Sequence, residues 1–199
     1  MAYNTATSGF MENSFKEEVA GICEAIDKAH RAIRPATLLL GHAELHNASA
    51  NRSAVAFERN PESDKAYYPE KIDPQVRVLR IQQAGEDVGA ITWFATHGTS
   101  LTDANFYIAP DNKGLASYMW EHDEKGVRYL RGHQNFVVAF SQTNAGDMTP
   151  NLGVKQMKPT GPAGTDFVKN NAIIAKRQYD ACKKAFESAT PISGAHLDV

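Results

Sequence analysis

The sequence of 199 residues is poor in several features that would assign it to a special class of protein. It has only two cysteines, Cys23 and Cys182, which are too few for a disulfide framework. Both stand in segments that we predict as helices, where we expect small buried side chains. Lysine and arginine number 21 against 23 acidic residues, and the net charge of -2 gives no basic excess. The sequence therefore predicts no nucleic-acid partner.

Long apolar runs and export signals are also missing. No run of 18 apolar residues occurs, so we expect no membrane-spanning helix. The first ten residues, MAYNTATSGF, have neither the basic start nor the apolar middle of a signal peptide. No internal repeat or low-complexity segment is present. With 42% apolar and 22% charged residues, the composition predicts a globular protein with a single domain over residues 1–199.

The hydrophobic pattern predicts an α/β fold, a mixed β-sheet covered by helices. Ser14 and Glu17 fit a capping box, and the helix that follows is expected to end before Pro35. Two more helices are expected at 115–122 and 166–188, where Phe167, Ile174, Ala181, Cys182 and Ala185 share a face. Strands are expected at 36–45, 76–81, 88–97 and 135–140, with a turn at 85–87, a loop at 150–164 and the start of another strand in the last nine residues. The strands at 88–97 and 135–140 are apolar on both faces, which predicts cover on both sides.

Two of these apolar strands end in polar loops. His97-Gly98-Thr99-Ser100 follows the first, and the segment from Asn144 to Thr149 follows the second. Ligands of open α/β sheets bind beyond the carboxyl ends of strands. A histidine on such a mount suits a metal ligand or a general base, and Gly98 would allow close approach. The alternative is a strand-capping histidine bonded to a loop, because one histidine does not make a zinc site.

The second loop contains GDMTPN, where Gly146 permits a tight turn and Pro150 fixes the backbone after Thr149. A hydroxyl held on such a turn could act as a nucleophile or an oxyanion donor. The alternative is a turn in which Asp147 and Thr149 bond their own backbone.

Three further patterns are weaker. Arg52 could hold a carboxylate or carbonyl, although loop arginines are usually solvated. His42 and His46, four residues apart, could bind a metal. Asn47 and Asn51 begin glycosylation sequons.

Three segments together resemble the neutral ceramidase family of zinc-dependent enzymes, which cleave the amide bond of N-acylsphingosines. They run from Ala48 to Pro61, from Trp93 to Tyr118 with its HGTS and DNKG motifs, and from Phe136 to Asn151 with GDMTPN. The opening segment YNTATSGF, Tyr3 to Phe10, is similar as well. The resemblance covers nearly the whole chain in order.

The resemblance implies roles for particular residues and a Zn²⁺ cofactor. His97 matches a catalytic zinc ligand, and Arg52 matches an arginine near the scissile amide. Thr149 stands where the family usually has a serine, which is a candidate nucleophile or amide contact. Threonine keeps that hydroxyl but adds a methyl group and a stiffer χ1. Neighbouring residues of the same motifs are expected to contact the substrate: Asn144, Gly146, Asp147 and Ser100.

The resemblance also implies what this chain lacks. The family's first zinc histidine, in a His-x-His motif, and a downstream glutamate and tyrosine have no counterpart here, so one of four ligands is present. We therefore expect part of a catalytic domain that needs missing flanking segments. By resemblance, the enzyme would act on ceramide transiently at a membrane surface, or be secreted. The alternatives are an inactive or lipid-binding remnant of the same fold, and another amide or ester hydrolase on the same scaffold.

Overall fold

A computed structural model describes residues 9–103, 105–132, 134–153 and 160–193, and the chain forms two compact units, residues 1–35 and 36–199. Each unit is described by itself. The first six residues of the segment Tyr3–Phe10 and the chain end at 194–199 lie outside the described residues. In the described part of the chain, no helix has both the length and the apolar character needed to cross a membrane.

The first unit consists mainly of one helix, α2 (Glu12–Arg31). The helix begins with Met11 at its N-cap and makes no side-chain capping bond there, so the predicted capping box of Ser14 and Glu17 is wrong. Ion pairs four residues apart stabilise its polar surface instead, as between Lys16 and Glu12 at 2.6 Å. No residue of α2 is buried, and Cys23 is exposed, which corrects the expectation of a buried thiol.

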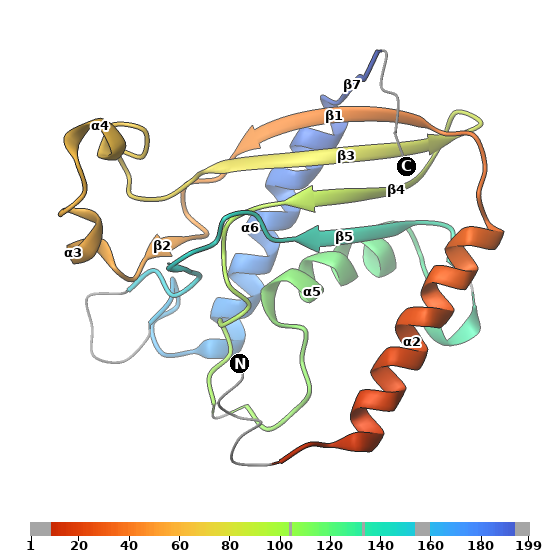
Figure 1. Ribbon diagram of the computed structural model, residues 1–199, viewed down its shortest axis with the longest axis horizontal. Coiled ribbons are helices and arrows are strands. Elements are labelled where there is room, and N and C mark those ends of the chain that lie inside the picture. Colours follow the sequence, from red (N-terminus) through yellow and green to blue (C-terminus); the bar gives the residue numbers. More distant parts are fainter. Residues whose placement is uncertain (1–8, 104, 133, 154–159, 194–199) are drawn as a thin grey trace. The chain divides into compact units, whose positions relative to one another are not determined.

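The second unit is built on a five-stranded sheet in the order β5-β4-β3-β1-β7 (Figure 1). Its strands are β1 (Thr37–Glu44), β3 (Gln75–Gln83), β4 (Glu86–Trp93), β5 (Val137–Ser141) and β7 (Thr190–Pro191). The pair of β4 and β5 is parallel, and the other pairs are antiparallel. The predicted mixed sheet is confirmed, with the β3–β4 turn at 84–85 and a short last strand.

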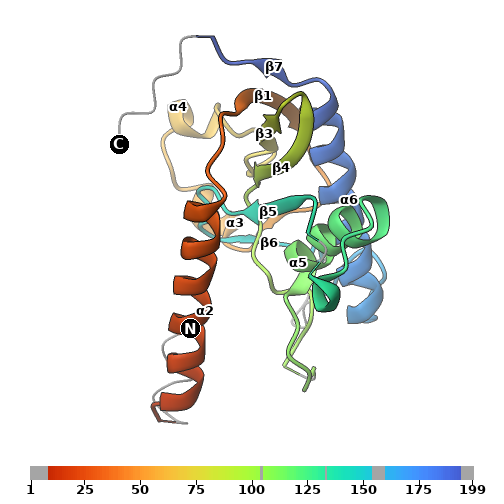
Figure 2. The same ribbon diagram turned by 90° about the vertical axis from the view of Figure 1, so that its right-hand side faces the viewer.

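Helices α5 (Asp111–Tyr118) and α6 (Phe167–Glu187) cover one face of this sheet (Figure 2). Trp120 lies at the centre of the core, in the π-helical turn Met119–Glu124 that continues α5. Its ring centroid is 5.2 Å from that of Phe186 and 5.8 Å from that of Phe136. On α6, Phe167 of the predicted apolar face is partly exposed. The other four residues of that face are buried: Ile174, Ala181, Cys182 and Ala185.

Two expectations for the second unit are wrong. The short helix begins at Asp111 rather than at residue 115, because it starts directly after Pro110. Strand β5 is an edge strand in the described sheet, and Val137 is 57% exposed, so cover on both faces is not observed there.

The turn-rich stretch from residue 47 to 74 holds short elements: β2 (Ala50–Asn51), α3 (Ala54–Phe57) and α4 (Glu62–Lys65). Strand β2 pairs with β6 (Met148–Thr149) in a separate two-stranded sheet. Figure 1 shows β2 beyond the carboxyl ends of β4 and β5. This small sheet therefore brings the NRS and GDMTPN motifs to the carboxyl end of β4, the strand that precedes His97.

Candidate functional site

The side chain of His97 is fixed by one backbone carbonyl. Its Nδ1 atom lies 2.6 Å from the carbonyl oxygen of Met148, and its backbone N–H donates to the same oxygen at 3.2 Å. Because a carbonyl oxygen can only accept, Nδ1 must carry the proton. The unprotonated Nε2 is then left to accept a proton or to bind a metal, which is how oriented histidine ligands are commonly held.

Arg52 and the loop before β6 are joined by two hydrogen bonds. The backbone N–H of Arg52 donates to the Asp147 carbonyl at 3.1 Å, and its Nε donates to the Asp147 carboxylate at 3.3 Å. Register in the small sheet places Ala50 opposite Thr149 and Asn51 opposite Met148. The structure thus brings the motifs of Arg52, His97 and Thr149 together from three separate segments.

The charge of Asp147 is supported by its neighbours. A hydrogen bond from Ser53 and, as the next largest cause, one from Arg52 hold the pKa of the Asp147 carboxyl below its usual value. Both side chains of the Arg52–Asp147 pair are about half exposed, so the pair contributes little to stability. The exposed half of the Arg52 side chain is accessible to a ligand.

Thr149 is 95% buried, and its Oγ1 accepts a hydrogen bond from the backbone N–H of Asn151 at 3.3 Å. The hydroxyl proton is therefore directed elsewhere, and the oxygen is held on a fixed backbone. Asn151 also donates from Nδ2 to the Thr99 carbonyl at 3.1 Å, which ties the GDMTPN and HGTS loops together. Gly146 has a φ of 47°, so the turn before Thr149 uses the conformation that glycine adopts freely.

The expected substrate contacts lie in different surroundings. Asn144 is exposed and lines a cavity of about 130 Å³ whose wall includes Met148. Ser100 is fully buried, and its hydroxyl accepts a hydrogen bond from Nδ2 of Asn112 at 2.9 Å. This hydrogen bond indicates that Ser100 helps to hold the HGTS loop in place.

The described residues do not form a complete metal site. Across residues 9–103, 105–132, 134–153 and 160–193, no group of three histidine, cysteine, aspartate or glutamate side chains could hold a metal ion. His46 instead lies 3.1 Å from Glu44 and 2.9 Å from Glu70, and the hydrogen bond with Glu44 raises its pKa. The orientation of His97 would suit one zinc ligand, whereas a zinc site takes three or four protein ligands.

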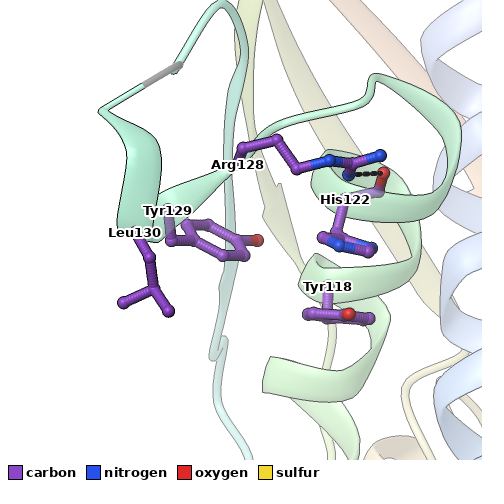
Figure 3. A pocket seen from close by; sticks show the side chains of 5 residues that line it. All are labelled: Tyr118, His122, Arg128, Tyr129 and Leu130. Atoms are coloured by element: carbon purple, nitrogen blue, oxygen red, sulfur yellow. Dashed lines mark hydrogen bonds between the residues drawn. The ribbon is translucent and has the colours of Figure 1, made fainter.

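A larger cavity, of about 350 Å³, lies away from this site. Figure 3 shows its lining of aromatic rings, an arginine and Leu130. The rings of Tyr118 and His122 stack with centroids 4.3 Å apart. None of the residues predicted for the site lines this cavity.

Sequence reasoning gave no role to several residues that hold the site. Asn151 links the two loops, and Asp111 and Asn112 bond the HGTS loop. The DNKG motif directly after Pro110 indicated a helix start, but its partners in the chain lie ten or more residues away and could not be predicted.

Comparison with known proteins places these motifs in a family. Residues 1–199 match the family model of the neutral/alkaline non-lysosomal ceramidase, N-terminal. The chain is 43% identical over 198 residues to a neutral ceramidase of Mycobacterium tuberculosis, covering all of this chain and 31% of that protein. It is 44% identical over 188 residues to the neutral ceramidase of Pseudomonas aeruginosa, covering 94% of this chain and 26% of that protein. The chain thus spans less than a third of the length of these relatives.

Solved structures agree. The crystal structure of the Pseudomonas aeruginosa neutral ceramidase matches 90% of this chain and 27% of its own, with a TM-score of 0.76 and 42% identity. A structure described as ceramidase complexed with C2 matches 94% of this chain and 28% of its own, with a TM-score of 0.82 and 41% identity. The chain therefore belongs to the neutral/alkaline non-lysosomal ceramidase family, to whose N-terminal part it corresponds.

Proposed function

We propose that this chain serves the hydrolysis of the amide bond of ceramide to sphingosine and a fatty acid, with Zn²⁺ as cofactor. Membership of the ceramidase family supports the reaction, as do the names of the relatives. The observation that carries the proposal is the hydrogen bond from Nδ1 of His97 to the Met148 carbonyl, which leaves Nε2 for a ligand. We assign His97 as one zinc ligand, with the others supplied by parts of the full-length protein.

When bound, zinc would polarise the amide carbonyl and lower the pKa of a bound water to about 7. The residues of this chain then have separate tasks. The Arg52 guanidinium donates hydrogen bonds toward the developing oxyanion and is kept in place by Asp147. The Thr149 hydroxyl, whose oxygen accepts from the N–H of Asn151, donates a hydrogen bond to the reacting carbonyl. Alternatively it adds to the carbonyl carbon while its proton passes to the departing amine, and water then releases the fatty acid from the Thr149 ester.

Substrate contacts are proposed for the rim of the small cavity. Asn144 offers an amide there, while Gly146 and Asp147 shape the turn that leads to Thr149. Ser100 supports these contacts indirectly, since its buried hydroxyl accepts a hydrogen bond from Asn112 and holds the HGTS loop. Ceramide resides in membranes, so we place the enzyme in sphingolipid metabolism, acting from a membrane surface or after secretion.

A second candidate function is ceramide binding without turnover. It is favoured by one observation, that the described residues contain no three-residue metal site. In that case the fold and its substrate-facing loops would remain, and the zinc-dependent step would be absent.

Hydrolysis of a fluorescent ceramide by the full-length protein that contains this chain separates these candidates. With added Zn²⁺, the first function predicts product release that chelator abolishes and that fresh Zn²⁺ restores. Turnover that chelator does not affect would contradict the zinc assignment. Saturable ceramide binding with no turnover in the presence of Zn²⁺ would favour the second candidate for this chain.

A further inference from the structure

The DNKG segment at the start of α5 has an unusual backbone. Asp111 is a non-glycine residue with a φ of 53°, and its side chain is nearly buried. This left-handed conformation costs an L-residue other than glycine about 1 kcal/mol or more, although aspartate and asparagine adopt it most readily. The surrounding contacts must therefore hold it in place.

Two of those contacts hold the end of the HGTS loop. The Asp111 carboxylate accepts hydrogen bonds from the backbone N–H groups of Ser100 and Leu101, each at 2.9 Å and each to a different oxygen. One of these oxygens also accepts from the N–H of Asn112 at 2.8 Å. An ionised carboxylate forms stronger hydrogen bonds with backbone N–H groups than a neutral acceptor does.

Asn112 holds the same loop from the other end. Its Nδ2 donates to the carbonyl oxygen of His97 at 3.0 Å and to the Ser100 hydroxyl at 2.9 Å. Its Oδ1 accepts from Nε2 of Gln178 on α6 at 2.8 Å, so the amide is anchored to the core. Asn112 and Gln178 are both fully buried, and their amides cannot exchange these partners for water.

A glycine allows this arrangement. A Cβ on Gly114 would lie 2.1 Å from that of Pro110, which excludes any side chain there, whereas a Cβ on Gly98 would make an ordinary contact with the Cβ of Asp111 at 3.5 Å. The segment from Pro110 to Gly114 therefore packs closely on itself and against the loop after His97.

We propose that Asp111 and Asn112 are positioning residues for His97. Together they bond the backbone at His97, Ser100 and Leu101, and so fix the loop from which the imidazole reaches the Met148 carbonyl. The inference deepens the proposed function and rests on it only for the identity of the group that His97 binds. Substitution of residues that orient a metal ligand typically costs about 10–100-fold in affinity or activity.

The test compares Asp111→Asn with Asp87→Asn. Asparagine tolerates the left-handed backbone and keeps the size of the side chain, but it offers one acceptor oxygen in place of two. Asp87 is a matched control, because its carboxylate bonds Arg80 and Gln82 at the far end of β4. Nitrogen-15 NMR spectra of the imidazole rings report the tautomer of each histidine. This measurement needs no bound ligand, no metal and no turnover.

We expect His97 in the wild-type chain to give resonances of the single tautomer that is protonated at Nδ1. In Asp111→Asn these resonances should average between tautomers, while His46 keeps its own and the protein remains folded. Asp87→Asn should leave His97 unchanged. Unaltered His97 resonances in Asp111→Asn, or an equal change in Asp87→Asn, would overturn the proposal.

Ceramide turnover by the full-length protein gives a second readout. There, Asp111→Asn should lower kcat by about 10–100-fold and leave KM within about twofold. Equal kcat in the two proteins would also overturn the inference. Absence of ceramide turnover by the full-length protein, together with the ring change in Asp111→Asn, would contradict the proposed function and leave the positioning role supported.

Discussion

At the scale of single residues, the site depends on hydrogen bonds that fix direction. The carbonyl of Met148 sets the tautomer of His97, and the N–H of Asn151 sets the Thr149 oxygen. Sequence could predict that these residues follow buried strands. It could not predict their partners, because Arg52 and Asp147 are 95 residues apart and no periodicity relates them.

The hydroxyl of Thr149 can be tested by isosteric substitution. Thr149→Val keeps the branched shape and removes the hydroxyl, so we expect ceramide hydrolysis to fall by about 10²–10³-fold, as for loss of an oxyanion donor. Thr149→Ser keeps the hydroxyl and should retain activity within about tenfold. Steady-state hydrolysis rates of the two variants, with unfolding curves as control, give the comparison. Similar rates for Thr149→Val and the wild-type chain would contradict the role of the hydroxyl.

Lys113 is a buried cation with neutral partners. Its Nζ donates to the carbonyls of Phe94 and Ser141 at 3.1 and 3.0 Å, and it lies 3.4 Å from Oε1 of Gln178. Desolvation by burial lowers the pKa of Lys113 to about 8, against 10.5 for the free side chain. The ammonium thus ties the ends of β4 and β5 together at a cost in free energy.

The pKa of Lys113 predicts a pH dependence. Above pH 8 the folded chain loses the Lys113 proton before the unfolded chain does, so the unfolded state binds more protons and stability rises with pH. The full shift corresponds to roughly 3 kcal/mol. Burial raises the pKa of Cys182 to about 12, which opposes this trend above pH 9. Between pH 8 and 9 we therefore expect the free energy of unfolding of the wild-type chain, relative to Lys113→Met, to rise by roughly 1 kcal/mol.

Urea unfolding of both proteins at pH 7, 8 and 9 measures this difference. Between pH 7 and 8 the difference should rise by only about 0.4 kcal/mol, because the folded chain loses half of the Lys113 proton by pH 8 while the unfolded chain keeps it. A difference that stays constant up to pH 9 would contradict the buried, desolvated ammonium.

At the scale of elements, most strands and the last helix were predictable, because their apolar period is local. The boundaries that failed depend on other forces. Helix α2 begins at Glu12, although the sequence pattern of a capping box starts two residues later. Helix α5 begins at Asp111, in a backbone conformation that its hydrogen bonds with the HGTS loop hold in place. Burial of β5 on both faces was wrong because it is the edge strand of the described sheet.

The contact between β1 and α6 can be tested at Gly41. A Cβ at this position would lie 1.9 Å from the carbonyl oxygen of Ala185, which is backbone and cannot move aside easily. Gly41→Ala should therefore lower the free energy of unfolding by about 1–3 kcal/mol. His42→Ala, next along the strand with its side chain exposed, is the control and should change stability by less than about 0.5 kcal/mol. Equal stability of the two variants in urea unfolding would contradict the close packing.

At the scale of the whole molecule, the sequence motifs predicted the family and the mixed sheet, and both are confirmed. The chain forms two compact units, and a single domain over residues 1–199 remains a prediction. The chain carries the HGTS, NRS and GDMTPN motifs on one small region of the fold, while it spans less than a third of its relatives' length. The central claim is that His97 is the zinc ligand that this part contributes.

Zinc-restored ceramide hydrolysis by His97→Ala, compared with His42→Ala, tests that claim most directly. Both substitutions are made in the full-length protein, which is stripped with chelator, supplied with Zn²⁺ and assayed with the same fluorescent ceramide. We predict that His42→Ala recovers the wild-type rate and that His97→Ala recovers less than about 1% of it, as expected for loss of a metal ligand. Recovery of the wild-type rate by His97→Ala would contradict the assignment.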